Sequence, residues 1–289
     1  MPRAINHVGP QPVELEYATF GDSLDASLPA ILLINGFTSQ MVWWHPEFID
    51  ALVAAGMFVI TYDNRDVGLS TWFDGVASKP APYTLSDMAR DGAAVLDDLD
   101  IDAAHIYGAS MGGMIAQTFA IDMPERCLTM ISVMSRTGGH GFGQATPEAT
   151  AALMAVPPRE RAAYIAQGVE TSRVYSSKTL FDADLVAHKQ AIQYDRAFHP
   201  EGAGRQMAAI IESGSREAAL ATLTVPTLAL HGLDDSLITP SGSERLAEIV
   251  PGCELVLVPE MGHDMPLPLI PQIAGSVIEF CSRHNDGVQ

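Results

Sequence analysis

Short apolar runs alternate along the chain with stretches that are apolar at every third or fourth position. The runs are partly β-branched and are bounded by Gly, Asp, Asn or Pro, so they predict buried strands. In the stretch Leu85–Leu99 the apolar residues share one helical face, and Thr84 or Ser86 can cap it. Strands that alternate with helices predict an α/β fold, with a mostly parallel central sheet and helices on both faces. The predicted strands are Ala30–Asn35, Met57–Asp63, His105–Ala109, Leu128–Ser135, Thr227–His231 and Glu254–Pro259.

Two segments depart from this alternation. Val13–Phe20 alternates polar and apolar residues, which predicts an antiparallel edge strand exposed on one side. Between Arg136 and Ala221 strand-like runs are absent, and the pattern there is helical, with scattered Met, Tyr and Phe. We therefore predict a core domain from residues 1–135 and 222–289, with residues 136–221 inserted as a helical cap.

Composition narrows the function. The 289 residues are enough for a sizeable core, with 47% hydrophobic and 18% charged residues. The formal net charge of −19 argues against nucleic acid, anionic membranes and acidic proteins as partners. The predicted cap carries nine basic and nine acidic residues, so all of that charge lies on the core. Three cysteines indicate no disulfide framework, and without an apolar leader or membrane span we expect a cytoplasmic protein.

One short motif carries the clearest chemistry. Gly108-Ala109-Ser110-Met111-Gly112 matches G-x-S-x-G, and it lies between a predicted strand and a predicted helix. This context is typical of a nucleophile elbow, a sharp turn that lifts a serine hydroxyl clear of the sheet. The flanking glycines allow the strand and the helix to approach closely, and the helix start offers free N–H groups to a developing oxyanion. Ser110 is therefore the candidate nucleophile.

A serine hydroxyl needs a base, and the base needs an orienting acid. His263 follows the last predicted strand, and Asp235 follows the one before it, with Asp234 as the reserve. The order serine, acid, histidine, each just after a strand, is that of hydrolases with a nucleophile elbow. Leu128–Ser135 contains no Asp or Glu, which excludes an acid from that strand.

The remaining candidates surround this set. The N–H groups of Phe37, after the first buried strand, and of Met111 are the predicted oxyanion donors. Trp43 and Trp44 are candidate substrate-binding residues, although at least one is expected in the core. Arg65 lies between aspartates and is expected to make structural ion pairs. The histidines and aspartates at 231, 234, 235, 263 and 264 match no metal-ligand spacing, so no metal site is predicted, and Asp264 is expected to point away from its neighbouring histidine.

Five motifs together resemble the α/β-hydrolase superfamily over nearly the whole chain: NGF (35–37), DNRDVGLS (63–70), GASMGG (108–113), HGLDD (231–235) and MGHDMP (261–266). Among these, DNRDVGLS and MGHDMP are most similar to the aclacinomycin methylesterase-like group of bacterial esterases. The resemblance implies a Ser-Asp-His triad without a cofactor, a helical cap, and cleavage of small carboxylic esters, including methyl esters of polyketides. Ser110, Asp235 and His263 match the triad motifs, and Phe37 and Met111 the oxyanion positions. Asn35 is a departure, because many members have His there.

We therefore expect a serine carboxylesterase that acts on small to medium apolar esters. The aromatic residues and methionines of the predicted cap indicate an apolar, fairly bulky pocket. Two alternatives stay open: an acyltransferase or cofactor-free perhydrolase with the same triad, and a non-catalytic ligand receptor on this fold.

Overall fold

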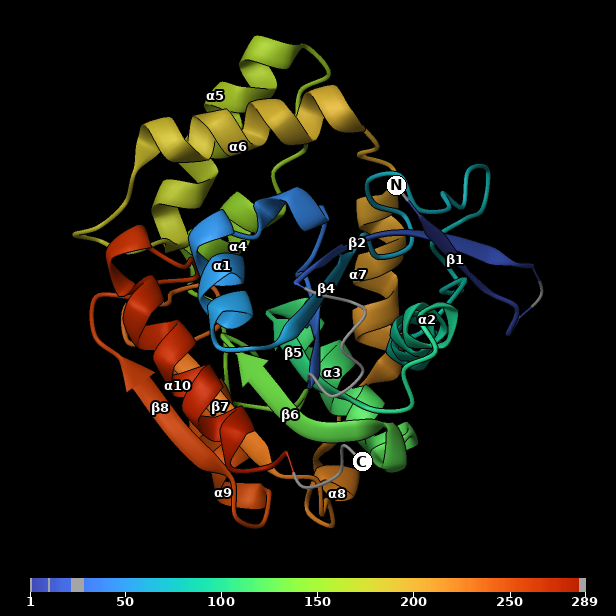
Figure 1. Ribbon diagram of the computed structural model, residues 1–289. Helices are drawn as coiled ribbons and strands as arrows, with labels where there is room; N and C mark the ends of the chain where they lie inside the picture. The colour runs from blue at the N-terminus through green and yellow to red at the C-terminus, as the bar shows by residue number, and fades with distance from the viewer. Residues whose placement is uncertain (1, 10, 22–28, 286–289) are drawn as a thin grey trace.

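Within the described residues, which are 2–9, 11–21 and 29–285, the computed structural model contains an eight-stranded sheet through the middle of the molecule (Figure 1). The strand order is β1-β2-β4-β3-β5-β6-β7-β8, and only β1 and β2 run antiparallel to their neighbours. The strands are β1 (Arg3–Asn6), β2 (Val13–Phe20), β3 (Ala30–Ile34), β4 (Phe58–Tyr62), β5 (Ala104–Ala109), β6 (Cys127–Val133), β7 (Thr227–Gly232) and β8 (Glu254–Val258).

Helices cover both faces of the sheet. The longer ones are α1 (Pro46–Ala54), α2 (Leu85–Asp98), α3 (Met111–Asp122), α4 (Pro147–Leu153), α5 (Arg161–Tyr175), α6 (Ala183–Arg196), α7 (Gly202–Ser213), α8 (Glu217–Leu220), α9 (Ser241–Ile249) and α10 (Ile270–Ser282). Three short 3-10 helices are η1 (Met41–Trp43), η2 (Pro124–Arg126) and η3 (Leu267–Leu269). In β3, Ile31 and Leu33 pack with α1 and α10, whereas Leu32 and Ile34 pack with α2 and α3. The predicted α/β fold, with a mostly parallel sheet between two helical layers, is confirmed.

The sequence predictions of the strands are accurate except at one edge. All six apolar runs are strands, and their ends agree within two residues. Val13–Phe20 is antiparallel as predicted, but its prediction as the edge strand is wrong, because β1 pairs along its other side. β1 has only four residues, RAIN, which is too short to give a pattern of its own. Helix α2 begins after Thr84, whose hydroxyl and backbone form a capping box with Asp87.

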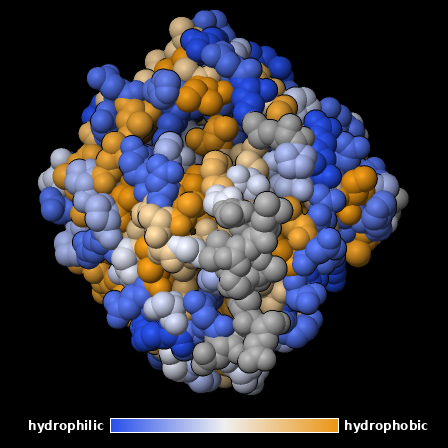
Figure 2. Space-filling model, viewed as in Figure 1, coloured by the Kyte–Doolittle hydropathy of each residue, from blue (hydrophilic) through white to orange (hydrophobic). Residues whose placement is uncertain are grey.

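The segment between β6 and β7 contains helices and no strand within its described residues. Helices α4, α5 and α6 lie together above the sheet in Figure 1, whereas α7 packs on α2 and α8 on α3 and α9. The domain boundaries at residues 136 and 221 stay a prediction. Among the described helices, none has the length and apolarity that crossing a bilayer requires. Figure 2 shows hydrophilic and hydrophobic residues mixed over the face in view, without one continuous apolar area.

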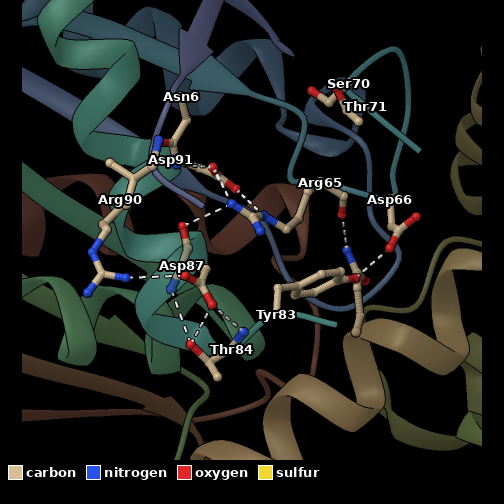
Figure 3. Close-up of polar contacts among 12 residues, drawn as sticks. Asn6, Arg65, Asp66, Ser70, Thr71, Tyr83, Thr84, Asp87, Arg90 and Asp91 are labelled. Atoms are coloured by element: carbon tan, nitrogen blue, oxygen red, sulfur yellow. Dashed lines mark hydrogen bonds and ion pairs between the residues drawn. The ribbon is translucent and has the colours of Figure 1, made fainter. Parts of the chain in front are cut away.

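The turn after β4 ties the inserted helices to the sheet. Arg65 makes the expected structural ion pair, but with Asp91 of α2 and not with the aspartates beside it (Figure 3). Those two aspartates pair with arginines of the inserted segment instead. Asp63 Oδ2 lies 2.6 Å from Arg196 Nη1, and Asp66 Oδ1 lies 2.7 Å from Arg205 Nη2.

Candidate active site

Ser110 occupies a strained turn between β5 and α3. Its φ of 58° and ψ of −120° are unusual for a residue with a side chain. A Cβ at Gly108 would lie 2.0 Å from the carbonyl oxygen of Gly112, and a Cβ at Gly112 would lie 2.0 Å from that of Ile34. Only glycine fits at both positions, so the close packing that the motif predicts is present and the turn has the geometry of a nucleophile elbow.

Three side chains from distant parts of the chain meet beside this turn. Ser110 Oγ lies 2.9 Å from His263 Nε2, and His263 Nδ1 lies 2.7 Å from Asp235 Oδ2. The parallel strands β5, β7 and β8 end at the same edge of the sheet, and each of these residues follows one of them. The structure thus brings together the three residues selected from the sequence. The reserve acid, Asp234, lies 3.7 Å from Lys178 Nζ instead.

Asp235 is held as a charged acceptor. Its Oδ1 accepts hydrogen bonds of 2.9 Å from the N–H groups of Leu237 and Ile238. Burial opposes its ionisation, but the charge of His263 and the hydrogen bonds from His231 and His263 outweigh burial and lower the pKa of Asp235 to about 2. Because the carboxylate can only accept, the proton of His263 lies on Nδ1, which leaves Nε2 free to accept the hydroxyl proton of Ser110.

His231 supports this acid and is not placed as a metal ligand. Its Nε2 faces the carbonyl oxygen of Ile238 at 2.7 Å and Asp235 Oδ2 at 3.2 Å, so Nε2 carries the proton. Its Nδ1 accepts from the hydroxyl of Ser243 at 2.7 Å. No cluster of three or more His, Cys, Asp or Glu suited to a metal ion occurs in residues 2–9, 11–21 and 29–285.

Two backbone N–H groups lie free beside Ser110. In the described part of the chain, the N–H groups of Phe37 and Met111 have no hydrogen-bond partner. The register of β3 and β5 sets Ile34 opposite Gly108, and two residues later a Cβ at Gly36 would lie 3.0 Å from that of Ser110. The loop that carries Phe37 therefore passes close to Ser110, and Met111 follows Ser110 directly, so both N–H groups are candidate donors of an oxyanion hole.

The loop after β3, which carries Phe37, is held in place by side chains that the sequence analysis did not select. The amide of Asn64 donates to the carbonyl oxygen of Asn35 at 3.0 Å, and the amide of Asn35 donates to that of Gln40 at 2.8 Å. Thr38 has a positive φ of 58°, and its N–H donates to Gln206 Oε1 at 2.9 Å. Asn35, the departure from the family pattern, thus stabilises the loop through its own side chain. Gln206 comes from α7, so the inserted segment also positions the loop.

A cavity of about 590 Å³ opens over Ser110, between the sheet edge and the inserted helices. Both tryptophans border it, but Trp44 is only 7% exposed and packs on Phe48 and Tyr107, so it belongs mainly to the core. Trp43 is half-buried and donates its indole N–H to Gln193 of α6. The aromatic part of the pocket prediction agrees with the lining, but the methionines of the inserted segment do not contribute. The aromatic residues of that segment in the lining are Tyr164, Tyr175, Phe181 and Phe198.

Comparison with known proteins fits this architecture. The family described as the alpha/beta hydrolase fold matches residues 29–267. The chain belongs to the α/β hydrolase family. It is also 32% identical over 280 residues to rhodomycin D methylesterase DnrP of Streptomyces peucetius, covering 89% of this chain and 91% of that protein. The resemblance to the aclacinomycin methylesterase-like group, seen in the sequence, is thereby confirmed.

Solved structures agree on the fold of this α/β hydrolase. The enol-lactonase from Burkholderia xenovorans LB400 superposes with a TM-score of 0.76 at 20% identity, covering 97% of this chain and 100% of that chain. A thermophilic esterase from Thermogutta terrifontis gives a TM-score of 0.76 at 24% identity, with 98% of each chain covered. At this level of identity the likeness concerns the fold alone.

Asp264, next to the candidate base, is expected to make stability depend on pH. Its Oδ1 accepts the N–H groups of Ser177 and Gly262 and is not bonded to the His263 ring, in agreement with the expectation that it points away. Burial raises the pKa of Asp264 to about 6, above its value in the unfolded chain. The folded protein therefore binds more protons between about pH 4 and pH 6, and stability falls as the pH rises through this window.

Asp264→Asn keeps the acceptor oxygen and removes the charge. We expect this variant to be more stable than the wild type by about 1–3 kcal/mol at pH 8, and by less at pH 5. Urea unfolding at the two pH values measures both differences. Asp234→Asn, which removes a nearby carboxylate 3.7 Å from Lys178 Nζ, is the matched control. Equal stability of Asp264→Asn and wild type at pH 8 would refute the prediction.

Proposed function

We propose that this α/β hydrolase is a serine carboxylesterase that works through an acyl-enzyme on Ser110. The observation that carries the proposal is the continuous hydrogen-bonded chain from Ser110 through His263 to Asp235, beside two free backbone N–H groups. This constellation suits acyl transfer because it combines a nucleophile, its base, an orienting carboxylate and donors for the oxyanion.

In the proposed reaction, Ser110 Oγ attacks the ester carbonyl while His263 Nε2 takes its proton. The N–H groups of Phe37 and Met111 stabilise the oxyanion of the tetrahedral intermediate. The protonated imidazole, stabilised by Asp235, then gives its proton to the departing alcohol, and the acyl group stays on Ser110. A water molecule, deprotonated by His263, releases the acid by the same steps. Every proton moves among these side chains, the substrate and water, so the proposed reaction needs no cofactor.

The substrates we propose are small to medium apolar esters, methyl esters among them. The cavity of about 590 Å³ is large enough for more than a simple acetate ester, and its lining is mainly apolar and aromatic. Trp43 is proposed to border the bound ester, whereas Trp44 packs mainly against Phe48 and Tyr107 in the core beneath the cavity wall. The similarity to rhodomycin D methylesterase supports a methyl ester as the bond that is cleaved, with methanol as the leaving group.

A panel of esters with varied acyl and alcohol groups, methyl esters included, tests this proposal beside the Ser110→Ala variant. We expect the wild type to release acid and alcohol, and the variant to be inactive with an unchanged circular dichroism spectrum. Adding methanol or hydrogen peroxide as competing acceptors and analysing the products separates the alternatives. Transfer to either acceptor in preference to water would favour an acyltransferase or perhydrolase. Tight binding without any turnover would favour a receptor.

A further inference from the structure

A buried lysine lines the cavity without a carboxylate partner. Lys189 lies on α6, and only 7% of its surface is exposed. Its Nζ donates to the carbonyl oxygen of Trp43 at 2.6 Å and lies 5.6 Å from the centre of the Trp43 ring. An ammonium group has three N–H donors, so this bond leaves others available. Within the described residues no carboxylate oxygen lies within 4.0 Å of Lys189.

The surroundings do not neutralise this cation. The acidic group whose charge acts on it is Glu47, an exposed residue at the start of α1. His45 lines the same part of the wall, and burial, reinforced by the charge of Lys189, lowers the pKa of His45 to about 4, so it is neutral. Burial lowers the pKa of Lys189 itself to about 8, so the ammonium form still predominates at pH 7. The wall thus holds one positive charge that no carboxylate contacts.

The two carboxylates that also line the cavity are committed elsewhere. Asp182 caps α6 by accepting the N–H of Leu185, and Asp264 accepts the two N–H groups described above. The nearby amide of Gln193 is likewise occupied, since its oxygen accepts from Trp43 and its nitrogen donates to Tyr164. Lys189 is therefore a cationic donor in this wall with N–H groups available to a ligand.

A buried charge without a partner is costly, and a ligand that supplies the opposite charge removes that cost. We propose that Lys189 binds a free carboxylate of the substrate, so that the site prefers esters that carry a second, ionised acid group. The proposal rests on the esterase function proposed above and adds its substrate class. The overall charge of −19 repels anions at long range. Binding of an anionic substrate therefore requires a local positive charge in the cavity, which Lys189 supplies.

Matched pairs of esters test the proposal: the monomethyl and dimethyl esters of the C4 to C8 dicarboxylic acids. We expect the wild type to show a lower KM for at least one monomethyl ester than for its dimethyl counterpart. Lys189→Met should raise the KM for that monoanion by about tenfold to a hundredfold, with little change in kcat or in the kinetics of the dimethyl ester. Lys189→Arg keeps the charge and should recover part of the loss. Lys178→Met, at an exposed lysine outside the cavity, is the control.

Binding without turnover separates the two proposals. Calorimetric titration of the monomethyl ester into Ser110→Ala should show binding that is lost in Ser110→Ala/Lys189→Met. If dimethyl esters are hydrolysed but the monoanion is not preferred, or if Lys189→Met raises both KM values equally, Lys189 only ties α6 to Trp43 and the carboxylate subsite is refuted. If no ester is hydrolysed but the monoanion binds through Lys189, the esterase proposal fails and the subsite stands.

Discussion

Ser110→Ala is expected to lower kcat by about 10⁴- to 10⁶-fold, which is the largest effect that a single substitution in this chain should have on activity. The hydroxyl lies 2.9 Å from His263 Nε2 and is the nucleophile of the proposed reaction. His263→Ala should lower kcat by a similar factor. Asp235→Asn should lower it somewhat less, because the imidazole keeps its position although it is no longer held in the tautomer with the proton on Nδ1. Ester hydrolysis by purified, folded variants measures each loss.

Combining the substitutions tests whether the three side chains act as one unit. Ser110→Ala/His263→Ala should be no slower than Ser110→Ala alone, since removing one member already disables the others. Asp234→Asn is the matched control: it changes an adjacent carboxylate that is not bonded to His263, and near-normal rates are expected. A folded His263→Ala protein with near-normal esterase rates would contradict the assignment of the base.

The central sheet could be predicted from the sequence because its parallel strands are buried on both faces. In β3 every residue is buried, so the apolar run is continuous and its ends are sharp. The antiparallel edge was harder. Alternation in Val13–Phe20 shows that one face is covered, but it carries no information on whether another strand lies alongside. Four-residue β1 supplies that strand, and it is too short for a hydrophobic pattern to reveal it.

The candidate triad was predictable for a topological reason. Ser110, Asp235 and His263 each follow a parallel strand, and parallel strands end at one edge, so positions far apart in the chain converge. The residues that hold these three side chains and the oxyanion loop in place do not follow the ends of parallel strands. Gln206 contacts the oxyanion loop from 168 residues away, and the carbonyl oxygen of Tyr175 accepts the N–H of His263 at 2.7 Å. Neither contact has a local pattern, because both depend on how the inserted helices pack on the sheet.

The same limit applies to Lys189. In the sequence it is one of nine basic residues balanced by nine acidic ones in residues 136–221, and that balance gives no sign of an unpaired charge. Other cations of the segment find partners, such as Arg196 on Asp63 and Arg205 on Asp66. Charge counts therefore describe the average of the segment, whereas the chemistry of the cavity depends on which of its cations lines the cavity.

Breaking the buried ion pair between Arg65 and Asp91 should destabilise the fold by about 3–5 kcal/mol. The contact is bidentate, with Arg65 Nε 2.6 Å and Nη2 2.7 Å from the two oxygens of Asp91, whose carboxylate also accepts the amide of Asn6 (Figure 3). The Arg65 side chain is 4% exposed and that of Asp91 0%, and the guanidinium also lies 5.0 Å from the centre of the Tyr83 ring. Arg65→Met leaves that buried carboxylate without its cation, so the midpoint of urea unfolding should fall while the m-value stays constant.

Replacing both partners separates the worth of the pair from the penalty of an orphaned charge. Arg65→Met/Asp91→Leu should recover much of the stability lost in either single variant, because no buried ion remains. The control is the equally bidentate but exposed pair of Arg161 and Asp195, whose loss in Arg161→Met should leave the urea midpoint almost unchanged. If Arg65→Met is no less stable than Arg161→Met, the turn after β4 is held by its other contacts and the ion pair is dispensable. If Arg65→Met is destabilised as predicted, the arginine of the DNRDVGLS motif serves to stabilise the fold. It then holds in place the turn whose aspartates, Asp63 and Asp66, pair with arginines of the inserted helices.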